Sequence, residues 1–472
     1  MLGGPRRTGA RGRTTSNGSI ALTAQDPVLD AAVVGGGISG LTCALRLRDR
    51  GLRVQLFEAL AVAGGCVRTL RRASYVADGG PQTFQMSAAF EQLVKDLGLE
   101  ERLVRAGRNS ATPYLFHRGR LVAVPASPSG LISSPLLSVG AKLRLAREPF
   151  VPARTDGVDE SIADFVERRA GREIVDTFVD PIVSGIFAGD PAALSMASVF
   201  PAMAAMEAKY ASVLRGAAAA SAAAGKRAPG AVGGFSGGND CLTSALLLRL
   251  GEGAQVSSPV GGLSRHEGSY RLAVDGEPAS RVAARKVVLA CPASSAADLL
   301  QETAPAAAEE LRAIDYPPAA QVALAYPRAA IGVPMDGFGF LASRRAGLRI
   351  LGAVWNSALY EDRVPPDEAL VTAVLGGVTD RSILERDDEA LARLAHADLR
   401  GAMRMSGDLP RVVAVFRWPN AIPQYSVGHE ARLTRIAKAL EALPGVALCS
   451  NYLRGASVPE CIRQATAVAE RL

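Results

Sequence analysis

A glycine-rich turn near the start of the chain has the spacing that binds the phosphates of a dinucleotide. Residues 35–40 read Gly-Gly-Gly-Ile-Ser-Gly and match the pattern G-x-G-x-x-G. The first glycine permits a tight bend, the second lets backbone approach a pyrophosphate, and the third lets helix and strand pack closely. A helix that begins here directs N–H groups and a partial positive charge at the phosphates. The predicted phosphate-binding residues are Gly35, Gly37, Ile38, Ser39 and Gly40.

The residues on either side of this turn predict the strand, helix and strand of a βαβ unit. Residues 31–34 form a short apolar run, apolar residues recur at helical spacing over 41–47, and residues 54–58 form a second strand-like run. Glu58 ends that run, eighteen positions after Gly40. A carboxylate there accepts hydrogen bonds from an adenosine ribose and repels a 2′-phosphate, which disfavours NADP.

Three further features favour FAD over NAD. Gly64 and Gly65 offer a second close approach of backbone soon after the second strand. Residues 287–292 predict a strand and turn at which the first sheet resumes after an inserted domain. A last helix over 460–472, preceded by Gly455, would aim its N-terminus at the pyrimidine end of a flavin, where the helix dipole stabilises negative charge. As an ordered set, these features predict an FAD-dependent oxidoreductase.

Length and charge indicate a protein of two or three lobes that does not bind nucleic acid. A chain of 472 residues, 48% apolar, exceeds one ordinary core. The formal net charge is +7, and four unopposed arginines before residue 14 leave about +3 for the rest. That mild excess suits an acidic small substrate or an anionic membrane surface, and no basic stripe points to nucleic acid. The acid-free residues 1–25 are either an organelle transit peptide or a disordered tail.

The cysteines and histidines predict no metal site. Six cysteines and four histidines are scattered without a C-x-x-C pair, which is typical of reduced, mostly buried thiols. No apolar run reaches the length of a membrane span.

Periodicity along the remaining chain predicts a helical middle and a strand-rich second half. A helix fits residues 90–103, residues 160–215 are mainly helical, and residues 216–230 predict a loop or a frayed helix end. Strands are expected over residues 270–274, 321–326, 348–354, 370–375 and 412–416. This order suggests a nucleotide-binding lobe interrupted by a second domain.

A series of segments beyond the glycine turn carries a family resemblance. The most distinctive runs from Asp180-Pro181 through Phe187-Ala188-Gly189 to Asp190-Pro191. The others are residues 121–125, 194–195, 315–318, 337–341, 351–352, 376–377, 417–419 and 422–429. With these segments, residues 31–472 resemble the oxygen-dependent protoporphyrinogen oxidases, which belong to the monoamine-oxidase-like flavoproteins.

The resemblance implies an α/β fold in three parts. These are a Rossmann-like FAD-binding domain, an interleaved α+β substrate domain and a helical insertion that associates with membranes. The boundaries we expect are 1–27 for the tail, 28–85, 231–308 and 431–472 for the FAD-binding domain, 86–130 and 309–430 for the substrate domain, and 131–230 for the helical region. Within that region, the stripe Phe200, Met203, Met206 and Tyr210 either enters a lipid interface or fills the interior.

The implied reaction is the six-electron oxidation of protoporphyrinogen IX to protoporphyrin IX, in which dioxygen reoxidises FAD and becomes hydrogen peroxide. Because the bridging carbons of a porphyrinogen are already activated by the pyrroles, we assign no catalytic base. The resemblance places the substrate at Phe187, Ala188, Gly189, Leu341, Leu351 and Tyr360. It adds Val260, Trp418, Ile422 and Gly455 to the residues near FAD.

Several positions depart from the family pattern. The arginine that anchors a substrate propionate is replaced by Pro113, and Arg108, Arg118 or Arg120 are the candidate substitutes. Val62 stands where the family has an arginine before the paired glycines, and Asn239 stands where it has a leucine after residues 237–238. Cys449-Ser450 stands where the family has two glycines before Asn451, and the added Cβ atoms are expected to crowd the cofactor.

These departures keep other interpretations open. Coproporphyrinogen III, with four propionates, is the closest alternative substrate, although Pro113 disfavours the more anionic molecule. An amine or carotenoid oxidoreductase is more distant, and a flavin-binding protein without catalysis belongs to another class. The resemblance also implies a peripheral membrane surface as a partner and admits a homodimer. It implies a chloroplast or mitochondrion in a eukaryote, or the cytoplasmic side of the inner membrane in a bacterium.

Overall fold

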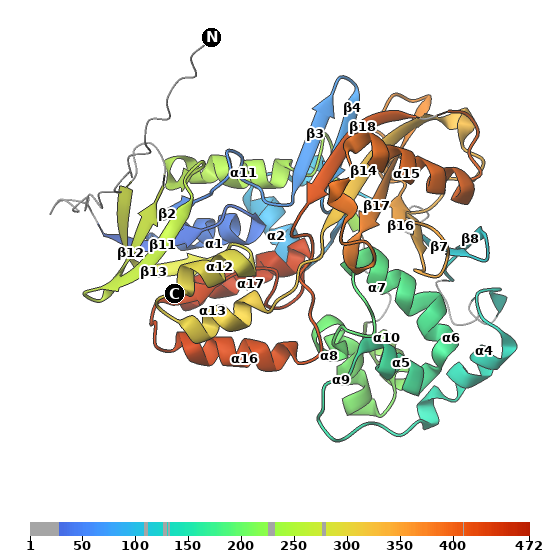
Figure 1. The fold of residues 1–472 in the computed structure, drawn as a ribbon, viewed down its shortest axis with the longest axis horizontal. Helices are drawn as coiled ribbons and strands as arrows, with labels where there is room; N and C mark the ends of the chain where they lie inside the picture. The colour runs from blue at the N-terminus through green and yellow to red at the C-terminus, as the bar shows by residue number, and fades with distance from the viewer. Residues whose placement is uncertain are drawn as a thin grey trace, which may run out of the picture.

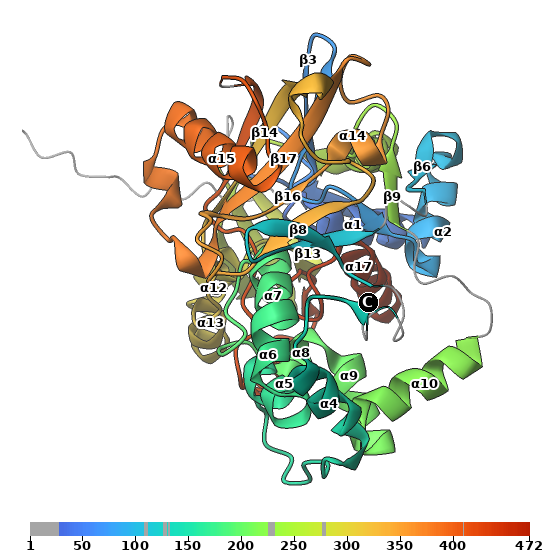
Figure 2. The same cartoon turned by 90° about the vertical axis from the view of Figure 1, so that its right-hand side faces the viewer.

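The computed structural model describes residues 28–107, 112–125, 130, 133–224, 232–275, 280–408 and 410–472. Figure 1 shows two sheets in separate lobes, and a helical region beside the second sheet. The same arrangement is visible after a quarter turn in Figure 2. The fold is mixed α/β, as predicted.

The first sheet has the order β10-β2-β1-β13-β12-β11, and β19 also pairs with β13. Neighbouring pairs among β10, β2, β1, β13 and β19 are parallel, whereas β11, β12 and β13 pair antiparallel. The strands are β1 (Leu29–Val34), β2 (Val54–Phe57), β10 (Ala254–Gln255), β11 (Val260–His266), β12 (Ser269–Val274), β13 (Ser280–Leu289) and β19 (Val446–Leu448). The predicted βαβ unit is confirmed by the parallel pairing of β1 with β2.

Helices cover both faces of this sheet because its central strands alternate their apolar side chains between two cores. Ala31 and Val33 of β1 belong to one core, and Ala32 and Val34 to the other. The first core also holds α1 (Ile38–Asp49), α2 (Ala88–Asp96), α11 (Cys241–Leu250) and α17 (Val458–Arg471). The second holds α12 (Ala293–Leu300), α13 (Pro305–Arg312) and α16 (His429–Leu440).

The second sheet has the order β18-β14-β17-β16-β15-β7-β8. Its strands are β7 (Pro113–His117), β8 (Arg120–Ala123), β14 (Ala319–Pro327), β15 (Gly339–Ala342), β16 (Ile350–Val354), β17 (Glu368–Gly376) and β18 (Arg411–Trp418). Helix α15 (Asp388–Ala402) packs against β14, β16 and β17 through a shared core. The strands predicted in this half of the chain are therefore confirmed.

Smaller elements join the two lobes. The hairpin of β3 (Arg68–Arg72) and β4 (Tyr75–Gly79) contacts β18 of the second sheet. The strands β5 (Phe84–Gln85), β9 (Val232–Phe235) and β6 (Leu103–Arg105) form a three-stranded sheet. The helix predicted to reach residue 103 is shorter, because Gly98, with φ +67°, follows the end of α2 and Leu103 already begins β6.

The helical region contains α4 (Val139–Ala146), α5 (Ile162–Ala170), α6 (Arg172–Ile174), α7 (Asp180–Phe187), α8 (Met196–Val199), α9 (Pro201–Tyr210) and α10 (Val213–Ala224). Helix α7 lies between this region and the second sheet (Figures 1 and 2). Of the loop or frayed helix end predicted from residue 216, the structure shows the helical alternative as far as residue 224, because α10 continues through an alanine-rich run of high helix propensity. Residues 225–231 lie outside the described residues. Among the helices that the structure describes, none is long and apolar enough to cross a membrane.

Candidate functional site

The turn between β1 and α1 is built from glycines that a side chain would disrupt. Gly35 has φ +110°, and a Cβ there would lie 2.8 Å from the backbone of Ala290 at the end of β13. A Cβ on Gly40 would collide with the Gly35 carbonyl oxygen. The first and third glycines of the motif therefore do what the pattern requires, which is to bend the chain and to press α1 against the sheet.

The second glycine faces open space instead. A Cβ on Gly37 would meet only the Cα of Gly65, 3.9 Å away. The predicted second turn lies opposite, because the Gly64 N–H donates to the Gly36 carbonyl over 2.8 Å and Gly64 forms a bridge with Gly37. Helix α1 has Gly37 as its N-cap, with no capping side chain and no acidic residue in its first turn. These two glycine turns form a cradle with the shape and polarity that a pyrophosphate requires.

Glu58 lies at the end of β2, beside this cradle. Its Oε2 accepts a hydrogen bond from the Gly36 N–H over 2.6 Å, and its Oε1 accepts one from Leu60 over 2.8 Å. The Glu58 carbonyl accepts from Ser258 over 2.8 Å, which places the segment leading to Val260 next to it. A carboxylate at the carboxyl end of the second strand is where a dinucleotide's adenosine ribose binds.

Trp418 connects to the same cradle through an arginine that the sequence did not single out. The Arg68 Nε donates to the Gly65 carbonyl over 2.9 Å, and its guanidinium lies 5.7 Å from the centroid of the Trp418 ring. Trp418 stacks on Phe416 and donates from Nε1 to Gln321 over 3.1 Å. The predicted pyrophosphate site and the predicted flavin-side tryptophan are therefore contiguous.

Gln424 connects the segment that follows Trp418 to the predicted substrate loop at residues 187–189. Its Nε2 donates to the carbonyls of Ile422 and Phe187, each over 3.0 Å. Gly189 packs against the same amide, since a Cβ there would lie 2.5 Å from Gln424 Oε1. Ala188 adopts the left-handed conformation with φ 52°, and its carbonyl accepts a hydrogen bond from Val378 over 2.9 Å. The 187–189 loop is thus held by hydrogen bonds on two sides, beside the segment that follows Trp418.

The Cys449 side chain packs in the core of the first lobe, and crowding of the cofactor by Cys449-Ser450 stays a prediction. The Cys449 side chain is fully buried in the core under α1, with Sγ 3.9 Å from the Ser39 carbonyl oxygen. The neighbouring Cys43 thiol and burial together raise the pKa of Cys449. Gly455, with φ +76°, leads into α17, which packs along α1. Val62 is 66% exposed at the surface.

Leu341 on β15 and Leu351 on β16 lie beside α7, and a substrate contact by either leucine stays a prediction. A Cβ on Gly185 of α7 would lie 2.5 Å from Leu341 Cδ2 and 3.3 Å from the Leu351 carbonyl oxygen. A glycine in this helix therefore lets it approach the β15–β16 hairpin closely. Both leucines reach the same helix whose end forms the 187–189 loop.

Tyr360 has different neighbours, in a buried ionic cluster that sequence reasoning missed. Its hydroxyl donates to the Gln82 carbonyl over 2.9 Å, and the Arg363 guanidinium lies 4.3 Å from its ring centroid. Arg363 and Asp78, both fully buried, form an ion pair of 2.8 Å. Burial raises the pKa of Asp78, which Arg363 opposes. A substrate contact by Tyr360 stays a prediction.

Asn239 belongs to this cluster, which explains why it departs from the family's leucine. Its backbone N–H donates to Asp78 over 2.8 Å, its Oδ1 accepts from Phe235 over 3.0 Å, and its Nδ2 donates to the carbonyls of Pro81 and Gln82. A leucine would keep the backbone N–H bond to Asp78, but it would remove the side-chain partners of the Phe235 N–H and of the Pro81 carbonyl.

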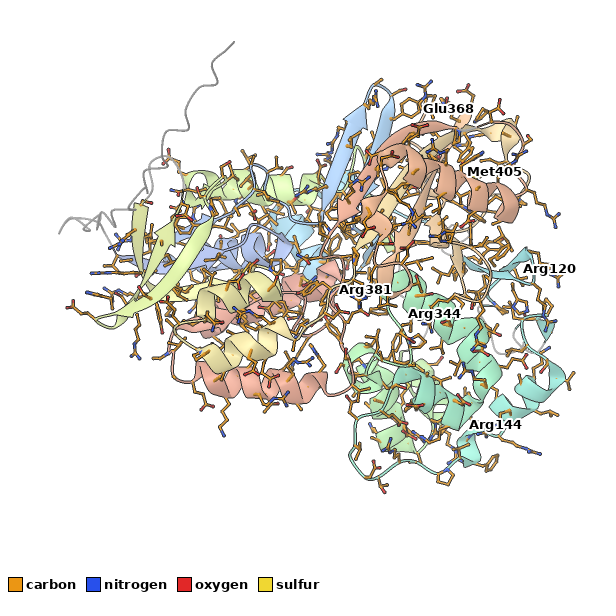
Figure 3. All side chains as sticks on the ribbon, in the orientation of Figure 1. Arg120, Arg144, Arg344, Glu368, Arg381 and Met405 are labelled. Carbon is orange, nitrogen blue, oxygen red and sulfur yellow. The ribbon has the colours of Figure 1, made fainter. Side chains whose placement is uncertain are left out.

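Pro113 stands where the family has a substrate-anchoring arginine. No contact among the described residues places a candidate replacement arginine beside the predicted substrate residues. Pro113 is exposed at the start of β7, and Arg118 is exposed in the β7–β8 turn. Arg120 is exposed at the start of β8 (Figure 3). Arg108 lies outside the described residues. Arg344, close to α7, is already committed to Asp180 and Asp190 over 2.6 and 3.0 Å. The residue that holds a propionate thus stays a prediction.

Within the described ranges no group of three His, Cys, Asp or Glu residues is placed to hold a metal ion.

The fold and the cradle define a dinucleotide-binding oxidoreductase, and comparison with known proteins identifies its family. Residues 38–472 match the model of the flavin containing amine oxidoreductases. The chain belongs to this family, and its cofactor is FAD. Glu58 and the two glycine turns fit the adenosine and pyrophosphate of that cofactor.

Individual relatives confirm the resemblance to protoporphyrinogen oxidases. The chain is 33% identical to protoporphyrinogen oxidase 1 of Spinacia oleracea, over 95% of this chain and 85% of the relative. It is 29% identical to coproporphyrinogen III oxidase of Bacillus subtilis, over 92% of this chain and 96% of the relative. A solved structure from Exiguobacterium, named as a candidate protoporphyrinogen oxidase, has a TM-score of 0.80 at 24% identity and covers 94% of this chain and 99% of its own. That likeness shows the fold.

Proposed function

We propose that this chain uses FAD to oxidise protoporphyrinogen IX to protoporphyrin IX, with dioxygen as the final electron acceptor and hydrogen peroxide as the second product. The observation that supports this most is the continuity of the site. The pyrophosphate cradle at Gly37 leads through Arg68 and Trp418 to the loop at Gly189, next to the helix that packs on Leu341. The relatives named as porphyrinogen oxidases span almost the whole chain.

The residues of the chain have a binding role in this proposal. FAD, when bound, supplies the acceptor for hydride equivalents from the substrate. The apolar side chains of Leu341 and Leu351 hold a flat macrocycle and exclude water, while Phe187 and Gly189 fix its edge. Because loss of hydrogen from a porphyrinogen leads to an aromatic product, the site needs no general base.

Protoporphyrinogen is the preferred substrate in this proposal because the described site offers little positive charge. Pro113 has neither charge nor an N–H donor. Arg344 is paired with two aspartates and Arg381 with Asp315 over 2.5 Å. A substrate with two propionates needs fewer cationic partners than coproporphyrinogen III with four.

A fluorescence assay tests the proposal. Purified FAD-loaded protein is mixed with freshly reduced protoporphyrinogen IX or coproporphyrinogen III in air, and porphyrin fluorescence and peroxide are followed together. We expect protoporphyrin to form well above the rate of autoxidation, with peroxide, and kcat/KM for protoporphyrinogen to exceed that for coproporphyrinogen by about tenfold or more, equivalent to about 1.4 kcal/mol. Faster use of coproporphyrinogen would support the alternative substrate, and no reaction with either would support a flavin protein without catalysis.

Membrane association is proposed for the helical region, through a surface different from the predicted stripe. Phe200, Met203 and Met206 are partly buried and pack inside the region, and Tyr210 is 36% exposed. Among the described residues of this region, the more exposed large apolar side chains are Val139, Leu143, Phe150, Val158, Ile186 and Leu214. The proposed location is a membrane surface in a chloroplast or a mitochondrion, or the cytoplasmic face of a bacterial inner membrane. The predicted transit peptide or tail, residues 1–27, lies outside the described residues. A homodimer stays a prediction.

A further inference from the structure

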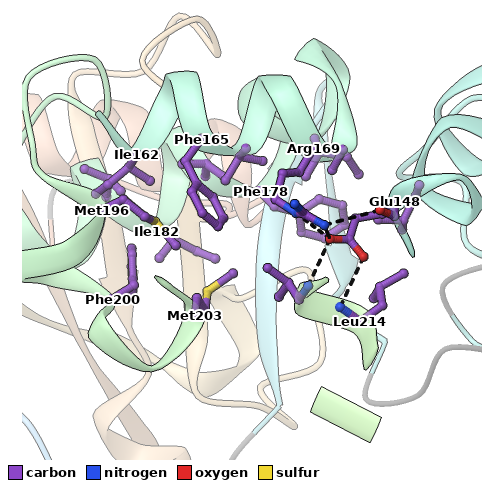
Figure 4. Close-up of a pocket in the computed structure, with 17 residues that line it drawn as sticks. Glu148, Ile162, Phe165, Arg169, Phe178, Ile182, Met196, Phe200, Met203 and Leu214 are labelled. Atoms are coloured by element: carbon purple, nitrogen blue, oxygen red, sulfur yellow. Dashed lines mark hydrogen bonds and ion pairs between the residues drawn. The ribbon is translucent and has the colours of Figure 1, made fainter. Parts of the chain in front are cut away.

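An apolar cavity of about 320 Å³ lies inside the helical region and has no part in the proposed reaction (Figure 4). Its walls come from residues 145–214, and Figure 4 shows Phe165, Ile182, Met196 and Met203 around the space. Protein interiors hold few voids larger than a water molecule. This cavity has about twice the volume of the roughly 150 Å³ apolar cavity that accepts benzene, and it reaches the range of small-molecule pockets.

The polar groups at one end of the cavity are already paired with each other. The Glu148 carboxylate accepts hydrogen bonds from Arg169 Nε and Ser212 Oγ, each over 2.5 Å, and from the Val213 N–H over 2.9 Å. Arg169 also donates to Glu207 over 2.5 Å. Because these charges are compensated, the interior offers nothing to a polar ligand and favours an alkyl chain.

The rim of the cavity combines exposed apolar and cationic side chains. Leu214 lines the cavity and is 41% exposed on the first turn of α10. Phe150, 80% exposed, lies nearby, since the Arg215 guanidinium is 5.9 Å from its ring centroid and α10 contacts the turn Glu148–Phe150. Arg147 and Arg215 are both exposed at this end. An amphiphile with an alkyl tail and an acidic head matches this arrangement.

We propose that the cavity binds the alkyl chain of a single-chain anionic amphiphile of the fatty-acid type. The chain fills the space between α5, α7 and α9, and the carboxylate lies at the rim near Arg147 and Arg215. The cavity adjoins the proposed porphyrinogen site, because its wall residue Phe200 lies edge-on to Phe187 with ring centroids 5.9 Å apart. The alkyl-chain proposal does not depend on the proposed function.

A chain-length series on the wild-type protein gives the first test. Full-length, FAD-loaded protein is titrated calorimetrically with straight-chain carboxylates up to dodecanoate, below their micelle concentrations. We expect one saturable site whose affinity rises about fourfold per added methylene and then stops rising once the cavity is full. Absence of saturable binding, or a rise without a limit and with many weak sites, would overturn the proposal.

A cavity-filling variant locates the site. Met203→Trp puts a larger side chain into the space from α9, and we expect it to weaken dodecanoate binding at least about tenfold. Leu248→Trp is the matched control, because Leu248 is 84% exposed on α11, and it should bind as wild type does. Circular dichroism establishes that both variants are folded. Equal affinity in folded Met203→Trp and in wild type would show that the chain binds elsewhere.

Two further titrations test the contribution of the carboxylate charge and the source of the ligand. Arg215→Gln is expected to weaken dodecanoate about two- to fivefold, with little effect on dodecanol, as suits a partly exposed ion pair; equal losses for both ligands would contradict the placed carboxylate. Vesicles containing phosphatidylglycerol distinguish a membrane lipid from a free acid. Binding of dodecanoate without displacement of the vesicles supports a free fatty acid as the ligand, whereas displacement of the vesicles by dodecanoate would overturn the single-chain assignment in favour of a membrane lipid.

Discussion

Replacing Gly37 with valine is expected to give a folded but colourless protein. Among the described residues, a Cβ at this position meets only the Gly65 Cα at 3.9 Å, and the φ of −74° suits valine. The branched side chain instead occupies the cradle for the pyrophosphate. Charge-assisted hydrogen bonds there contribute about 1.5–3 kcal/mol each, so losing two lowers the FAD affinity roughly 100-fold or more.

The flavin-to-protein ratio, read from the absorbance of FAD released on denaturation, measures this effect. Gly401→Val is the matched control, because Gly401 lies on α15 with no positive φ, and a Cβ added there would have no neighbouring atom within 4 Å. We expect that control to purify yellow. If Gly37→Val were equally yellow, the cofactor would not lie between the two glycine turns.

Replacing Arg363 with methionine is expected to destabilise the whole protein by about 3–5 kcal/mol. Methionine fills much of the volume of arginine but leaves the Asp78 carboxylate buried without its counterion, 2.8 Å from the lost guanidinium nitrogen. Asp78 also holds Thr69 and the Asn239 backbone, so the junction between the β3–β4 hairpin and β9 should loosen. Urea denaturation followed by circular dichroism measures the change.

Two further variants separate loss of the ion pair from loss of an arginine. Arg393→Met removes an exposed partner of Glu389 and should change stability by about 0.5 kcal/mol or less. Adding Asp78→Asn to Arg363→Met removes the uncompensated charge and should recover part of the loss. An Arg363→Met protein as stable as Arg393→Met would mean that Asp78 is neutral or hydrated in the folded protein.

The parts of the fold that the sequence predicts are those encoded by neighbouring residues. Gly35, Gly37 and Gly40 are close in sequence, and the conformations that they require follow from the absence of a Cβ. Four strands of the second sheet, β14, β16, β17 and β18, were predicted because their β-branched and apolar residues form short runs between turn signals. The position of Glu58 followed from the end of the strand that carries it.

The features that the sequence did not predict depend on contacts between distant segments. Asp78 and Arg363 are 285 residues apart, and neither position has a local pattern that marks it as buried. Arg68 was missed for the same reason, since its importance comes from Trp418 on another sheet. The direction of the Cys449 side chain also could not be predicted, because it is set by the packing of α1 on the first sheet. The helical cavity arises from several helices together and leaves no trace in residue spacing.

The central claim is that a flavin held between the two glycine turns takes electrons from a porphyrinogen bound beside α7. Anaerobic mixing of the FAD-loaded protein with protoporphyrinogen IX tests it most directly, with the visible absorbance followed in a stopped-flow instrument. We predict that the flavin band bleaches as the porphyrin band grows, and that admitting air restores the flavin band. A flavin band that stays unchanged while porphyrin forms only at the rate of the protein-free control would contradict the proposal.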